Sequence, residues 1–280
     1  MRYFVRLSYS GTGFHGWQIQ PREESVQAAL EKALSTLLRT KTTVTGAGRT
    51  DTGVNAIGYI AHFDADNLPD AKILTYKLNA ILPRQIAVLE IGPAGDNFHA
   101  RFDASRREYT YFLHRVKDPF MDSFSYMCCY PGLDFGLMNE AASSLLGRHD
   151  FRCLEKTGAD SKTSLCTVFS AIWEPYPPSL CAWDPFPTGA EPRYWKFRIA
   201  ADRFLRNMVR ATVGTLLEVG RGKRSIADFS SLILPEDFES DSLSRECGCR
   251  ASASGGTIPS RCAAGESVPG NALFLSGVDY

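Results

Sequence analysis

The order of strand-like and helix-like segments between residues 2 and 91 constrains the fold more than any other feature of the chain. Residues 2–9 alternate in polarity, with every second residue from Tyr3 to Tyr9 on one face, as in a half-buried strand. Ser25 is placed to cap a helix whose apolar stripe consists of Val26, Leu30, Ala33, Leu34, Leu37 and Leu38. Strand patterns at 42–45 and 57–63, a helix pattern at 70–80 and a strand pattern at 86–91 follow. This β-α-β-β-α-β order is typical of a ferredoxin-like unit.

The second half repeats the order without repeating the sequence. It predicts strands at 107–116, 164–173, 193–200 and 272–278, and helices at 134–146 and 204–219. We therefore expect an α+β fold of two pseudo-symmetric ferredoxin-like halves, residues 1–104 and 105–280, that share an antiparallel sheet. Helices on one face of that sheet would leave the other face as a central cleft.

Two segments interrupt the second half. Residues 174–192 are rich in proline and aromatic residues and indicate a long, ordered excursion between two strands. Residues 235–265 begin acidic and continue with Ser, Gly, Ala and Cys without hydrophobic periodicity. This second segment is predicted to be an exposed, mobile insertion.

Composition narrows the class of protein. The 280 residues are 44% hydrophobic, and the formal net charge is zero, which argues against a protein that coats nucleic acid indiscriminately. No apolar run approaches the ~20 residues of a membrane helix, and the N-terminal residues lack the hydrophobic core of a signal peptide. We expect a soluble, cytoplasmic protein.

The eight cysteines fall into two groups. Five of them are scattered in apolar or strand-like surroundings and are predicted to be reduced: Cys128, Cys129, Cys153, Cys166 and Cys181. Cys247, Cys249 and Cys262 fall in the insertion, and without an obvious fourth ligand or paired spacing they predict no bound metal.

A glycine-rich loop at 46–55, Gly-Ala-Gly-Arg-Thr-Asp-Thr-Gly-Val-Asn, lies between two predicted strands. Glycine permits close backbone approach and unusual dihedral angles, so the loop looks built to present Arg49 and Asp51. The alternative is an ordinary turn, because Asp, Thr and Gly are common turn residues.

Basic residues gather in two further places. Arg203, Arg206 and Arg210 are spaced three and four apart, which places them on one face of the helix predicted at 204–219. They would form either a solvated helix edge or a site for a carboxylate or phosphate.

The second cluster alternates basic and aromatic residues from Phe98 to Tyr111 and includes Arg101, Arg107 and Tyr109. Aromatic rings stack on exposed bases while arginines meet phosphates in RNA recognition, although Tyr109 could equally fill the core. His99 by itself is more often a structural histidine than a catalyst.

These motifs together resemble the tRNA pseudouridine synthase A family. The resemblance rests on the loop string Gly-Arg-Thr-Asp-x-Gly-Val and extends to nearly the whole chain outside the insertion. The other motifs are 9–18, Phe98 to Phe102, Met208-Val209-Arg210 with Val213-Gly214, and Leu273-Phe274-Leu275 before Val278-Asp279-Tyr280.

The resemblance implies an activity and its residues. Members convert uridines in the anticodon stem-loop of tRNA, at positions 38, 39 and 40, to pseudouridine, and they work as homodimers without a cofactor. Carried over, Asp51 is the catalytic carboxylate, Arg210 pairs with it, and Tyr109 stacks on the target uracil. Arg49 helps to hold the flipped nucleotide and Leu273 lines the pocket. Arg101, Arg107, Arg203 and Arg206 are candidates for contacts with the RNA backbone.

The chain departs from the family pattern at two positions. Asn55 stands where many members have His, and Ala272 where a Gly usually precedes the last Leu. Two other functions remain open: a non-catalytic RNA-binding protein on the same scaffold, and an unrelated carboxylate-dependent hydrolase. A glycoside hydrolase would need a second carboxylate at a defined separation, and the sequence places none beside Asp51.

Overall fold

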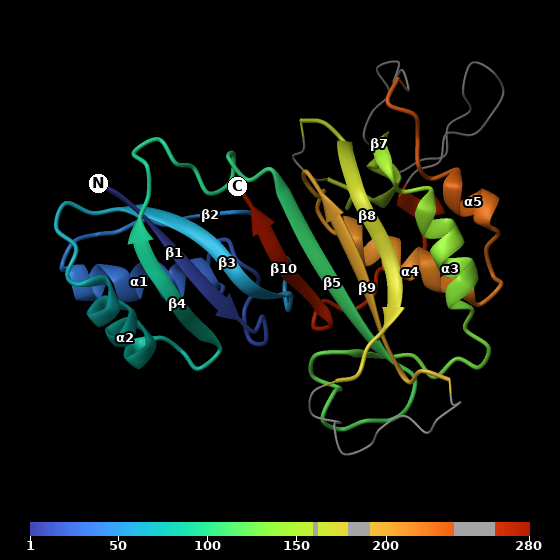
Figure 1. Cartoon of the computed structure of the whole chain (residues 1–280), viewed down its shortest axis with the longest axis horizontal. Coiled ribbons are helices and arrows are strands. Elements are labelled where there is room, and N and C mark those ends of the chain that lie inside the picture. The colour runs from blue at the N-terminus through green and yellow to red at the C-terminus, as the bar shows by residue number, and fades with distance from the viewer. Residues whose placement is uncertain (159–161, 179–190, 238–260) are drawn as a thin grey trace. The chain divides into compact units, whose positions relative to one another are not determined.

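The computed structural model describes residues 1–158, 162–178, 191–237 and 261–280 (Figure 1). These residues form two compact units, one of Met1–Tyr109 with Gly270–Tyr280 and one of Thr110–Pro269. The division at 104/105 predicted from the sequence differs from this one, because the C-terminal strand belongs to the first unit. The segment 174–192 and the insertion at 235–265 fall largely outside the described residues.

The first unit has the predicted order of elements. The elements are β1 (Arg2–Tyr9), α1 (Val26–Leu38), β2 (Thr45–Gly46), β3 (Asn55–Asp64), α2 (Ala71–Ile81), β4 (Ile86–Pro93) and, from the C-terminus, β10 (Leu273–Asp279). β1 is antiparallel to β3 and β4, β2 is antiparallel to β3, and β10 is parallel to β3. The strand order is β4-β1-β3-β10, with α1 and α2 beside these strands in Figure 1.

Local signals in the sequence explain these elements. Alternate side chains of β1 are buried from Tyr3 to Tyr9, as its period predicts. The Ser25 side chain accepts a hydrogen bond from the Ala28 N–H and caps α1, and Asp70 caps α2 in the same way. The predicted strand at 42–45 is wrong in its bounds. The N–H groups of Thr42 and Val44 bond to side chains of α1 instead, so pairing begins only at Thr45.

The second unit contains two layers. Its elements are the remainder of β5 (Arg106–His114), β6 (Tyr126–Met127), α3 (Phe135–Ser143), β7 (Gly147–Asp150), η1 (Arg152–Leu154), β8 (Leu165–Pro175), β9 (Tyr194–Ala201), α4 (Met208–Gly220), α5 (Ile226–Ser230) and η3 (Arg261–Ala263). β7, β8 and β9 are antiparallel neighbours. Asn139 of α3 exchanges hydrogen bonds with the backbone of Trp173 on β8, which holds the helix on the sheet.

The helix predicted at 204–219 begins later than expected. Asn207 adopts φ +65°, in the left-handed region, and α4 starts at Met208. Arg203 and Arg206 therefore precede the helix, and only Arg210 lies on it. The prediction that these three arginines share one helix face is wrong, because the chain turns at Leu205 to Met208 before the helix begins.

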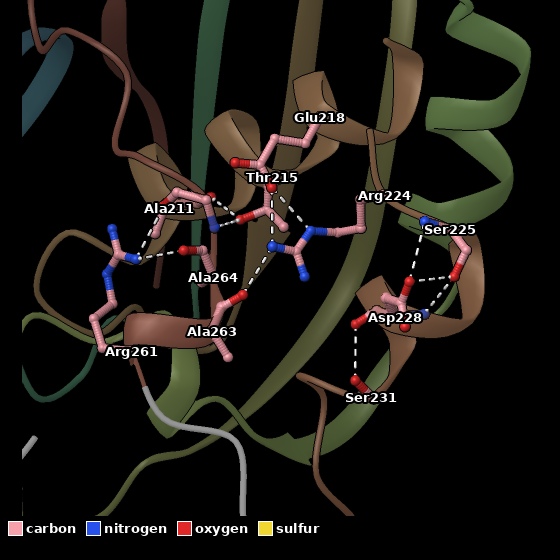
Figure 2. A network of polar contacts seen from close by, with 11 residues as sticks. Ala211, Thr215, Glu218, Arg224, Ser225, Asp228, Ser231, Arg261, Ala263 and Ala264 are labelled. Carbon is pink, nitrogen blue, oxygen red and sulfur yellow. Dashed lines mark hydrogen bonds and ion pairs between the residues drawn. The ribbon is translucent and has the colours of Figure 1, made fainter. Parts of the chain in front are cut away.

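The segment after residue 260 packs tightly on α4 (Figure 2). Arg224 donates to Glu218 and to the Ala263 carbonyl, and the Gly265 N–H donates to Thr215. A Cβ atom at Gly214 would lie 1.8 Å from the Glu266 carbonyl oxygen, so glycine permits this close approach. The chain that leads into β10 is thereby attached to the buried helix of the second unit.

The cysteines of the described residues partly follow the prediction. Cys128, Cys129, Cys153 and Cys166 are free thiols, whereas Cys262 is disulfide-bonded. Burial raises the pKa of Cys153 to about 12 and makes it a poor nucleophile. Cys181, Cys247 and Cys249 lie outside the described residues. Every helix in the described part of the chain is too short or too polar to cross a bilayer.

Candidate active site

The loop between β2 and β3 presents Arg49 and Asp51. Arg49 is exposed and Asp51 is half-buried. The Asp51 carbonyl accepts from the Val54 N–H at 3.1 Å, and Gly53 has φ +76°, so the loop closes in a tight turn directly before β3. The glycine-rich segment thus forms a turn that leaves the Arg49 side chain exposed and the Asp51 side chain half-buried.

The segment after β1 packs against this loop. The Trp17 N–H donates to the Thr50 carbonyl at 3.3 Å, and the Gly53 N–H donates to the Phe14 carbonyl at 3.4 Å. Gly16 has φ +86°, and a Cβ atom there would lie 2.3 Å from the Thr50 carbonyl oxygen. Two parts of the sequence motif, 34 residues apart at Gly16 and Thr50, therefore meet backbone to backbone.

Two buried tyrosines bond to the loop. The Tyr9 hydroxyl lies 2.9 Å from Thr50 Oγ1, and the Tyr59 hydroxyl donates to the Gly48 carbonyl while accepting from the Gly48 N–H. Sequence reasoning missed both contacts. Tyr9 belongs to a motif that it singled out, but the position of Tyr59 under the loop depends on the pairing of β2 with β3.

Asn55 closes the other end of the loop. Its side-chain oxygen accepts from the Gly11 N–H at 2.9 Å, and its nitrogen donates to the Asn271 carbonyl at 2.7 Å and the Leu273 carbonyl at 3.4 Å. The amide is buried and joins three backbone segments, which gives a structural role to a residue whose role the sequence left open. Leu273 is itself buried, at the first position of β10.

Tyr109 lies in the electrostatic field of Asp51. Burial raises the pKa of Tyr109 well above its ordinary value, and the negative charge of Asp51 raises this pKa further. The structure therefore brings together two of the residues that the sequence singled out. Tyr109 is buried in this structure and stays a neutral phenol at physiological pH.

Arg107 has a contact that the sequence did not predict. Its guanidinium donates to the Ala47 carbonyl from Nη2 at 3.0 Å, and to the carbonyls of Arg101 and Ala104 at 2.6 and 3.1 Å. Burial lowers the pKa of Arg107 but leaves it charged. The guanidinium thus ties the start of the Asp51 loop to the turn after Phe98.

The turn after Phe98 exposes aromatic and basic side chains. Phe102 and Arg101 are exposed, and the Arg101 guanidinium lies 5.8 Å from the Phe102 ring centroid. His99 stacks on Phe102 at 4.3 Å between ring centroids, and its Nδ1 accepts from the backbone of Arg101 and Phe102. His99 is structural here, as the sequence suggested.

The remaining arginines belong to the second unit. Arg210 donates from Nε to the Val268 carbonyl at 2.7 Å, which joins α4 to the chain before β10. Arg203 is half-buried and Arg206 is exposed. Among the described residues, no group of three or more His, Cys, Asp or Glu side chains is placed to hold a metal ion.

Comparison with known proteins decides the family. The family model described as tRNA pseudouridine synthase matches residues 7–103 and 141–247, which include the Asp51 loop and α4. The tRNA pseudouridine synthase A of Bacteroides fragilis is 44% identical over 280 residues, covering all of this chain and 96% of the relative. The chain belongs to the tRNA pseudouridine synthase family.

More distant relatives of the same name also align along the whole chain. The tRNA pseudouridine synthase A of Bacillus subtilis is 36% identical over 286 residues, covering all of this chain and 99% of the relative. The chain is thus an isomerase of the pseudouridine synthase family that acts on uridine in tRNA. This rules out the unrelated hydrolase as an interpretation.

Proposed function

We propose that this tRNA pseudouridine synthase modifies the anticodon stem-loop at positions 38, 39 and 40, with Asp51 as the catalytic residue. The observation that carries the proposal is that Asp51 is close enough to Tyr109 for its charge to raise the pKa of that phenol. The loop that carries Asp51 is fixed by hydrogen bonds to the Tyr9 and Tyr59 hydroxyl groups. A fixed carboxylate beside an aromatic ring suits a reaction on a base that has left its helical stack.

The proposed reaction is redox-neutral. The N1–C1′ bond of uridine breaks, the uracil turns, and a C5–C1′ bond forms while C5 loses its proton and N1 gains one. Asp51 acts as a nucleophile or as a base at the start of this sequence. Tyr109 stacks on the uracil and Leu273 lines its pocket. Because atoms and electrons balance within the nucleotide, the chemistry needs no cofactor.

The arginine side chains supply positive charge for the catalytic carboxylate and for the RNA. Arg210 pairs with Asp51, because a guanidinium group beside partly buried surface favours a carboxylate partner. Arg49 holds the flipped nucleotide. The exposed Arg101 and Arg206 contact the RNA backbone, together with Arg203 and the accessible part of Arg107.

We further propose two pseudo-symmetric ferredoxin-like halves that share a sheet around a central RNA-binding cleft, in a homodimer that works in the cytoplasm. The motif order along the chain and the element order of the first unit support the architecture. Size-exclusion chromatography with light scattering tests the dimer, and a mass of one protomer would contradict it.

The experiment that tests the function uses an unmodified tRNA transcript with uridines at positions 38, 39 and 40. The purified protein is incubated with it, and pseudouridine is mapped by carbodiimide labelling and primer extension. We expect stops at these positions, and none in a matched transcript with cytidine there. Modification elsewhere in the tRNA only would contradict the proposed site.

A further inference from the structure

Three aromatic residues form a buried support beneath the Asp51 loop. The ring of Tyr59 lies 4.2 Å from that of Trp17 and 5.6 Å from that of Tyr9, between ring centroids. Exposed fractions are 0% for Tyr59, 3% for Trp17 and 4% for Tyr9. Rings packed this closely have few alternative rotamers, so the hydroxyl groups of Tyr9 and Tyr59 are fixed in space.

The two hydroxyl groups bond to the loop on either side of Arg49. Tyr59 holds both the N–H and the carbonyl of Gly48, with 3.2 Å between the Gly48 nitrogen and the hydroxyl oxygen. Tyr9 holds the side chain of Thr50, the residue directly before Asp51. Burial raises the pKa of Tyr59 and of Tyr9, so both phenols stay neutral and keep their donor protons.

Glycine makes this contact geometrically feasible. A Cβ atom at Gly46 would lie 2.1 Å from the Tyr59 hydroxyl oxygen and 2.6 Å from the Trp17 ring. The loop therefore approaches the aromatic support more closely than a loop with a side chain at this position allows.

We propose that Tyr59 and Tyr9 are positioning residues that fix the backbone around Arg49 and thereby orient the Asp51 carboxylate. The inference rests on the proposed role of Asp51 and adds two residues that act through it. The Asp51 carboxylate must reach one atom of a flipped nucleotide. The reaction slows when the loop that carries it samples other conformations, because misplacement of reacting groups is costly.

The variants Tyr59→Phe and Tyr9→Phe remove only the hydroxyl groups and keep the rings. Tyr3→Phe is the matched control, since Tyr3 is also a buried tyrosine of the first unit but its hydroxyl faces Met1 Sδ at 3.8 Å. All three are compared with wild type for kcat and KM on the tRNA transcript, and for melting temperature, which reports whether the variant is folded.

We expect kcat to fall roughly tenfold for Tyr59→Phe and roughly threefold for Tyr9→Phe, with KM nearly unchanged, as one or two lost hydrogen bonds imply. Tyr3→Phe should match wild type. A role confined to stability would instead lower the melting temperature without changing kcat at a temperature where the protein is folded.

A second readout is independent of activity. Trypsin can cleave the Arg49–Thr50 bond in the loop and the Arg39–Thr40 bond at the end of α1, two exposed arginines followed by the same residue. We expect the ratio of loop cleavage to Arg39–Thr40 cleavage to rise severalfold in Tyr59→Phe and Tyr9→Phe. An unchanged ratio together with unchanged kcat overturns the inference. Absence of pseudouridine with the wild-type protein overturns the proposed function instead, and the cleavage ratio then still decides whether the phenols fix the loop.

Discussion

Arg107 donates to the Ala47 carbonyl from two nitrogen atoms, Nη2 at 3.0 Å and Nε at 3.3 Å. The same guanidinium also holds the carbonyls of Arg101 and Ala104. One side chain on β5 thus fixes both the beginning of the Asp51 loop and the turn that exposes Arg101.

Arg107→Met should lower the free energy of unfolding by about 1–3 kcal/mol, because it leaves partly buried carbonyls without a strong donor. Urea unfolding followed by circular dichroism measures this change. Arg84→Met removes an exposed arginine from the same unit and should stay within about 0.5 kcal/mol of wild type. Equal stability of the two variants would contradict the structural role of Arg107.

Arg101→Met should affect tRNA binding and leave stability unchanged, the reverse of Arg107→Met. Arg101 is exposed, so its loss should leave stability unchanged but weaken tRNA binding and reduce the slope of log affinity against log salt by about one. Filter binding across a salt series measures both quantities. An unaltered slope would remove Arg101 from the proposed contacts with the RNA backbone.

The free energy of unfolding should depend on pH through His62, a residue of the first unit. Its Nδ1 accepts from the Ala100 N–H at 3.1 Å, which requires an unprotonated nitrogen. Burial, with the charges of Arg2 and His99, lowers the pKa of His62 in the folded protein. The unfolded chain then binds a proton on His62 more readily than the folded protein does. The stabilisation by unprotonated His62 is therefore complete above the unfolded pKa of ~6.5 and is lost as the pH falls below it.

His62→Gln keeps an acceptor that does not titrate. Urea midpoints between pH 7.5 and 5.5 should therefore fall less for His62→Gln than for wild type. His15→Gln changes an exposed histidine and should retain the wild-type dependence. Identical pH profiles for His62→Gln and wild type would contradict the effect.

Much of the first unit could be predicted from the sequence, because its signals are local. The period of two in β1 and the Ser25 cap of α1 need only neighbouring residues. The start of α4 could not be predicted, since the pattern continues through Asn207 although its backbone is left-handed.

The site shows the same division. The glycine pattern identified the Asp51 loop, and the alternation around Tyr109 identified a residue that lies near it. The contacts of Tyr59 and Arg107 depend on which strands pair and in what register, and residues 11 and 60 positions away in the sequence supply their partners. Such pairs leave no local pattern in a single sequence.

Arg210→Met tests the proposed pairing with Asp51. Loss of the positive charge should reduce turnover strongly, because the Asp51 carboxylate then lacks its proposed counter-ion in the site. Stability should fall as well, since Arg210 also bonds to the Val268 carbonyl.

Arg203→Met and Arg206→Met serve as comparisons for Arg210→Met. These two arginines precede α4 and are proposed to contact phosphates, so their loss should weaken tRNA affinity with little change in turnover at saturating tRNA. Turnover of Arg210→Met at saturating tRNA that matches these variants would exclude the ion pair.

The central claim is that Asp51 performs the chemistry, and tritium release from tRNA labelled at C5 of uridine measures it most directly. Each C5–C1′ bond formed releases one label. Wild-type protein should release it from positions 38, 39 and 40, whereas Asp51→Asn, which is nearly isosteric but cannot ionise, should release none above background while binding tRNA within a few fold of wild type. Tritium release by Asp51→Asn at a rate near that of wild type would contradict the account.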